Sequence, residues 1–149
     1  MTTFQEMEQC LRAAYTAFNS RNITAALALM SSSVEWPRAF KGGHVTGHEE
    51  IRAYWTEQWH EIDANVEPIS YHYLTDNSVL VEVHQIVKDL SGSPLADGIV
   101  GHRFTFTSRL ISRMDVCDFP GPLTAKAPEA IPLDANLSPP PANDNLGYT

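Results

Sequence analysis

The sequence predicts an α+β domain, in which a curved sheet carries its helices on one face. Apolar residues recur every three or four positions up to about residue 62, and every second position from residue 64 to 117. Helices followed by a run of consecutive strands are typical of this class. Seven of the ten prolines follow residue 118, where they disfavour both helix and sheet. We therefore expect a folded domain over residues 1–118 and an extended or disordered tail over residues 119–149.

Two helices are expected first. The apolar face of the first runs from Phe4 to Phe18, and polar residues 19–22 end it. Asn22 can cap the second helix, because its side chain can accept a hydrogen bond from a free amide of the first turn. Apolar residues continue at helical spacing from Ile23 to Met30, and the serines that follow end the pattern.

A short strand over residues 34–36 ends at a proline, and a third helix follows. Thr46 and Glu49 have the spacing of a capping box, which predicts where this helix begins. Its broad, largely aromatic face is made of Ile51, Tyr54, Trp55, Gln58, Trp59 and Ile62. Four strands with alternating apolar residues then follow, over residues 66–74, 79–87, 98–107 and 110–117.

Charge and cysteine content exclude several classes of protein. The chain has 149 residues and a net charge of −8, and an acidic surface repels nucleic acid and anionic membranes. No apolar run approaches the length of a membrane span, and the start lacks the pattern of a signal peptide. Cys10 and Cys117 are too few for a disulfide framework or a zinc site. We expect a cytoplasmic protein without metal or cofactor.

Several segments resemble the SnoaL-like, nuclear-transport-factor-two-like superfamily. They are residues 47–55 (GHEEIRAYW), residues 34–37 (VEWP), and FTF at 104–106 before a tight turn into LISR at 110–113. The element order matches over residues 4–118, and the tail is not covered. The resemblance implies a conical barrel, in which a strongly curved, mainly antiparallel sheet carries about three helices on its concave face around a pocket. It also implies a homodimer formed through the sheet.

The last hairpin supplies a pair of polar residues for such a pocket. If Ser108 and Arg109 form a two-residue turn, His102 lies opposite Asp115 on the face rich in phenylalanine. A carboxylate bonded to one imidazole nitrogen leaves the other free for proton transfer. The alternative is a cross-strand pair that only satisfies two polar groups at the barrel mouth. A change of one residue in the turn would separate the two side chains.

Other candidate residues come from several elements. His84 faces either the pocket or, because the opposite face of its strand is more apolar, the partner subunit or solvent. For the remaining histidines, solvated positions are expected. Apolar and aromatic side chains could line a ligand cavity, with core packing as the alternative for most of them. They are Phe18, Met30, Trp36, Tyr54, Trp55, Trp59 and Phe104.

The resemblance also suggests roles and departures. Tyr15 stands where the ketosteroid isomerase branch has a tyrosine that donates to a developing oxyanion, and His102 falls near the protonated acid of that branch. Trp36 replaces the catalytic aspartate of that branch, which argues against its mechanism. Thr105 leaves the Arg-x-Asp pair of the limonene-epoxide-hydrolase branch incomplete. The polyketide-cyclase branch, with an aspartate base and a nearby histidine, fits His102 and Asp115 best.

Two functions stay open. The first is a cofactor-free general acid/base enzyme of cyclase, isomerase or dehydratase type, acting on a small hydrophobic carbonyl compound. In it Asp115 and His102 would move the proton, and Tyr15 would polarise the carbonyl. The second is a non-catalytic ligand-binding or association module with the same fold. For the tail, the alternative to disorder is an extended segment that lies across the partner or the pocket mouth.

Overall fold

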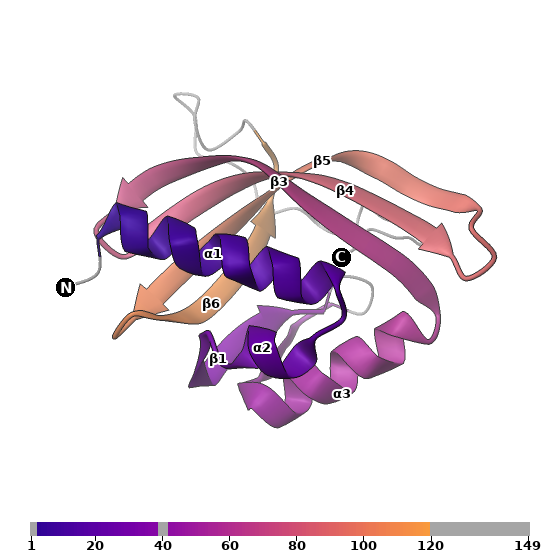
Figure 1. Cartoon of the computed structure of the whole chain (residues 1–149), viewed down its shortest axis with the longest axis horizontal. Helices are drawn as coiled ribbons and strands as arrows, with labels where there is room; N and C mark the ends of the chain where they lie inside the picture. Colours follow the sequence, from indigo (N-terminus) through magenta and orange to yellow (C-terminus); the bar gives the residue numbers. More distant parts are fainter. Residues whose placement is uncertain (1–2, 39–41, 120–149) are drawn as a thin grey trace.

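Three helices and six strands make up the described part of the chain, residues 3–38 and 42–119, in the computed structural model (Figure 1). The helices are α1 (Phe4–Asn19), α2 (Ile23–Leu27) and α3 (Gly47–Trp59). The strands are β1 (Met30–Pro37), β2 (His44–Thr46), β3 (Ile62–Thr75), β4 (Ser78–Asp89), β5 (Pro94–Thr107) and β6 (Leu110–Cys117). The predicted α+β class is confirmed. The expected tail lies, after Phe119, outside the described residues.

The six strands form one sheet in the order β2-β1-β6-β5-β4-β3. All neighbours pair antiparallel except β1 and β6, which pair parallel, so the prediction of a mainly antiparallel sheet is also confirmed. In Figure 1, α1 lies along one face of the curved sheet, and α2 and α3 lie near β1. None of the helices in the described ranges is long and apolar enough to cross a membrane.

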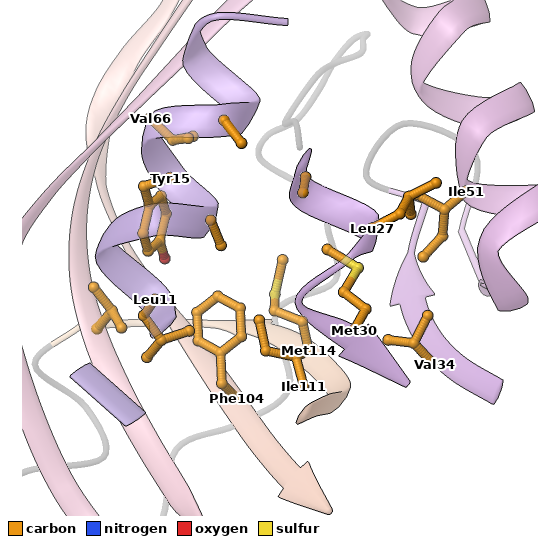
Figure 2. Packing of buried hydrophobic residues seen from close by; sticks show 14 of the residues in the cluster. Leu11, Tyr15, Leu27, Met30, Val34, Ile51, Val66, Phe104, Ile111 and Met114 are labelled. Atoms are coloured by element: carbon orange, nitrogen blue, oxygen red, sulfur yellow. The ribbon is translucent and has the colours of Figure 1, made fainter. Parts of the chain in front are cut away.

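The core lies between α1 and the face of the sheet that this helix covers, which we call the covered face. Met7 and Leu11 of α1 are fully buried, as are Val79 and Val81 of β4. Figure 2 shows the continuation of this core, which runs from Ile111 and Met114 across Met30 to Val34 and Ile51. Burying each such side chain contributes about 1.5–3 kcal/mol, so this apolar layer fixes which face of every strand points inward.

Of the two expected caps, the structure confirms one, since the Asn22 side chain accepts a hydrogen bond from the Ala25 N–H at the start of α2. Thr3 and Glu6 form a capping box at α1, in which each side chain accepts a hydrogen bond from the other residue's backbone N–H. The capping box expected at Thr46 and Glu49 is wrong. The Thr46 side chain makes no capping bond, and its backbone N–H instead donates to Glu50 at 2.7 Å. Thr46 has the extended backbone of an N-cap, but Gly47 follows at a φ of +86°, outside the helical region.

Replacing Gly47 by alanine should lower the free energy of unfolding by about 1–2 kcal/mol. The residue has positive φ, and an added Cβ would lie 3.4 Å from the Ser32 carbonyl oxygen. Urea denaturation followed by circular dichroism measures the loss. Gly98→Ala in β5 is the control, because no atom lies within 4 Å of its added Cβ and its φ is ordinary. Equal effects of the two substitutions would contradict this account.

The β5–β6 hairpin contains a bulge that changes its register. Its two-residue turn is confirmed, since Thr107 pairs with Leu110 and Phe106 pairs with Ile111. The register then shifts by one residue at Ser112. The Ser112 hydroxyl donates to the Thr105 carbonyl at 3.1 Å and accepts from Thr107, so it has hydrogen bonds on both sides.

This shift overturns the predicted pairing of His102 with Asp115. His102 lies opposite Val116, and Asp115 lies opposite Arg103. Because successive side chains of a strand point to opposite faces, a slip of one residue moves Asp115 to the face that α1 does not cover. The cause is local, namely one extra residue in β6 between the turn and the predicted pair.

Candidate functional site

A cavity of about 540 Å³, its open mouth included, lies between α1, α3, β1 and the covered face of the sheet. Only four of the thirteen lining residues carry a hydroxyl, imidazole or amide group, and the others are apolar or indole side chains. The lining residues are Ala14, Tyr15, Phe18, Met30, Trp36, Pro37, Tyr54, Trp55, Gln58, Val66, His102, Phe104 and Met114.

Tyr15 and His102 form a buried hydrogen-bonded pair in this cavity. The Tyr15 hydroxyl lies 2.8 Å from His102 Nδ1, and the two ring planes are nearly parallel, with an interplanar angle of 8°. Tyr15 is 6% exposed and His102 is 4% exposed. Helical spacing on α1 directs Tyr15 inward beside Leu11, and Figure 2 shows its hydroxyl directed toward Phe104. His102 shares the covered face with Phe104, two residues further along β5.

The other ring nitrogen of His102 is the unusual atom of the site. His102 Nε2 is buried and has no hydrogen-bond partner among residues 3–38 and 42–119. An unsatisfied buried polar atom costs about 1–3 kcal/mol, and such atoms are rare in native proteins. Because His102 is one of the residues that line the cavity, its imidazole is the polar group of the cavity wall that lacks a hydrogen bond.

Burial keeps both members of the pair neutral. It lowers the pKa of His102 to about 3, from an ordinary value of 6.5. Burial, and to a smaller degree the nearby Tyr71, raises the pKa of Tyr15 well above 10. A neutral imidazole carries one proton, so Nε2 donates when Nδ1 accepts from Tyr15, and Nε2 accepts when Nδ1 donates. His102 Nε2 can therefore form a hydrogen bond with either an acceptor or a donor of a ligand.

Aromatic rings connect this pair to α3. Phe104 lies 5.9 Å from Tyr15 and 6.2 Å from Trp36 between ring centroids. Trp36 contacts Trp55 edge to face at 5.5 Å, and Trp55 contacts Phe18 at 5.2 Å. Such packing is favourable for rings and presents flat apolar walls to a ligand.

A second polar side chain enters the cavity from α3. Gln58 is 7% exposed, and its amide nitrogen donates to the Tyr54 hydroxyl at 3.1 Å, one helical turn earlier. The sequence placed Gln58 on the aromatic face of this helix but gave it no role. The sequence signal for such a residue is a single amide side chain within an otherwise apolar face of a helix.

A family model described as a SnoaL-like domain matches residues 11–117. The chain belongs to the SnoaL-like family. This confirms the resemblance drawn from the motifs of β1, α3 and the last hairpin. Among curated proteins, none matches this chain.

Solved structures with the same fold include proteins crystallised with ligands. TerC, co-crystallised with polyporic acid, is 22% identical, covers 74% of this chain and 89% of its own, and has a TM-score of 0.66. A Xanthomonas campestris protein named as a candidate polyketide cyclase is 19% identical, covering 75% and 89%, with a TM-score of 0.65. A Mycobacterium tuberculosis protein in complex with estradiol-17β-hemisuccinate is 12% identical, covering 74% and 92%, also at 0.65. These similarities show the fold of the SnoaL-like domain.

The structure brings eight of the predicted site residues together in the lining of the cavity. They are Tyr15, Phe18, Met30, Trp36, Tyr54, Trp55, His102 and Phe104. Trp59 packs behind this wall, with its ring 5.2 Å from Phe18 and 5.7 Å from Trp55, and does not line the cavity.

Two predicted residues lie away from the cavity, on the opposite face of the sheet. Asp115 accepts hydrogen bonds from Arg113 at 3.0 and 3.1 Å, and His44 Nε2 lies 3.5 Å from it. His84 lies 2.6 Å from Asp97 and alternates with the buried Val83. The bulge at residue 112 displaces Asp115, and strand alternation directs His84 outward. Within the described ranges, no three potential metal ligands lie close together.

Proposed function

We propose that this SnoaL-like domain binds a small, largely apolar molecule and holds one polar group of that molecule with Tyr15 and His102. The observation that carries the proposal is His102 Nε2, a buried polar atom without a partner in the described structure, on a residue that lines an apolar cavity. A ligand group that forms a hydrogen bond with Nε2 would remove the energetic cost of burying this atom without a partner.

The chemistry of the pair suggests the class of polar group. Because Tyr15 and His102 are both neutral, a carbonyl or a hydroxyl group fits better than a charged group. The walls formed by Trp36, Trp55 and Phe104 suit a flat hydrocarbon frame. The polyporic acid and estradiol derivative bound by proteins of the same fold support such a ligand.

The test compares 2-naphthol with naphthalene, which has the same frame without the hydroxyl. Isothermal titration calorimetry should show that the wild type binds 2-naphthol about tenfold more tightly, as one neutral hydrogen bond predicts. His102→Leu should remove this difference and keep the affinity for naphthalene. Asp115→Ala, on the opposite face, is the control and should preserve the difference. A preference for 2-naphthol that persists in His102→Leu would contradict the proposal.

The same pair supports a second candidate, a cofactor-free acid/base enzyme of cyclase, isomerase or dehydratase type. Tyr15 would donate to a carbonyl oxygen as negative charge develops, and neutral His102 would accept a proton at Nε2. The low pKa of His102 makes it a weak base, so binding is the first proposal. Deuterium exchange at the α-carbons of 2-tetralone, followed by NMR, separates the two. Exchange accelerated by the wild type and not by His102→Leu would favour the enzyme.

Assembly, location and domain limits are also proposals. We propose a homodimer formed through the sheet, which the exposed Leu95 and Ile99 of β5 support. Light scattering tests it, because Ile99→Lys should lower the measured mass from that of a dimer to that of a monomer.

Cys10 and Cys117 are free thiols, which supports a reducing compartment such as the cytoplasm. The family match ends at residue 117, which supports a domain over residues 1–118 and a tail over 119–149.

A further inference from the structure

The cavity holds a polar position on α3 that the proposed function does not use. Gln58 makes one hydrogen bond within the described structure, from its amide nitrogen to Tyr54. Its amide oxygen and second N–H therefore have no partner there, although the side chain is almost fully buried and lines the cavity. Unlike His102 Nε2, the Gln58 amide oxygen is not fully shielded by the described residues, so a polar group of a ligand in the cavity can reach it and bond to it.

This position is separate from the Tyr15–His102 pair. Tyr15 comes from α1 and His102 from β5, whereas Gln58 comes from α3. Rings lie between the two positions, since Phe104 contacts Tyr15 and Trp36 contacts both Phe104 and Trp55. Gln58 follows Trp55 by three residues and shares its helix face. The cavity is therefore polar at two positions, with flat apolar walls between them.

We propose that the ligand carries two polar groups, one on each side of a flat apolar frame. The first binds His102 Nε2, and the second is a hydroxyl that donates to the Gln58 amide oxygen. This inference rests on the proposed function, because it adds a second contact to the same bound molecule. It narrows the ligand class from any apolar carbonyl or hydroxyl compound to rigid aromatic or polycyclic compounds with two oxygen functions.

The test compares ligands that carry one and two hydroxyls at two lengths. The pairs are 2-naphthol with 2,6-dihydroxynaphthalene, and 4-hydroxybiphenyl with 4,4′-dihydroxybiphenyl. At one of these lengths, the second hydroxyl should increase the affinity of the wild type about tenfold, well above the statistical factor of about two for a symmetric ligand. Gln58→Met has a similar shape without the amide, and it should lose this gain, so that its affinities for the compounds with one and two hydroxyls differ by no more than the statistical factor of about two.

Two results would overturn the inference: a second hydroxyl that changes affinity by less than about threefold at both lengths, or a gain that persists in Gln58→Met. Neither result affects the proposed function, which depends on 2-naphthol against naphthalene and on His102→Leu. Thermal denaturation checks that Gln58→Met is folded. If that variant is not folded, Gln58→Asn replaces it, because asparagine keeps the amide but is shorter by one methylene. Gln58→Asn should also lose the increase in affinity caused by the second hydroxyl.

Discussion

Lowering the pH from 8 to 5 should reduce the free energy of unfolding by about 2 kcal/mol through His102 alone. Burial lowers the pKa of this histidine to about 3 in the folded protein, from 6.5. Between these two values the unfolded chain binds the proton and the folded chain does not. Acid therefore favours the unfolded state. The full stability is present above about pH 6.5 and is lost progressively as the pH falls toward 3.

The measurement is urea denaturation of the wild type and His102→Leu at both pH values. Carboxylates also titrate in acid, but they contribute equally to the two proteins, so the difference between the two pH dependences isolates His102. The wild type should lose about 2 kcal/mol more than His102→Leu. His60→Gln is a control, since His60 is exposed and its loss should leave the wild-type behaviour intact. Equal pH dependence in wild type and His102→Leu would show that His102 is not buried as described.

The order of elements could be predicted from the sequence because it depends on local periodicity. The helical face beginning at Phe4 and the alternation from residue 64 onward are properties of neighbouring residues, and both became elements of the expected type. Errors arose where pairing with a distant strand decides the structure. Met30 was expected in a helix, yet it begins β1, where it pairs with Ile111 of β6. The three residues of β2 are too short to show any period.

The part of the candidate site that depends on local helical spacing could also be predicted from the sequence. Helical spacing directs Tyr15, Tyr54 and Trp55 inward, and the structure places all three at the cavity. The partner of His102 could not be found in this way. The turn sets the hairpin register only as far as the next bulge, and nothing in the sequence marks Ser112 as that bulge. The bond from His102 to Tyr15 joins residues 87 positions apart, which no local spacing reveals.

Replacing Trp55 by alanine should lower the free energy of unfolding by about 3–5 kcal/mol. Its side chain is 2% exposed and contacts the rings of Phe18, Trp36 and Trp59 at 5.2 to 5.7 Å. These rings come from three different elements, so they cannot collapse together into the space left by the indole. The new space would also join the existing cavity. Urea denaturation followed by circular dichroism measures the loss.

Tyr73→Ala is the control for removing an aromatic ring, because Tyr73 is 51% exposed, and the expected loss is below about 1 kcal/mol. Added indole should then distinguish a cavity with the shape of the missing side chain from a general loss of packing. It should raise the unfolding midpoint of Trp55→Ala and leave that of Tyr73→Ala unchanged, since only the first has a matching space that indole can fill. A loss below about 1 kcal/mol for Trp55→Ala, or equal shifts with indole in both variants, would show that Trp55 is not a supporting wall of the cavity. A large loss restored by indole would mean that the cavity's shape depends on the same rings that stabilise the fold.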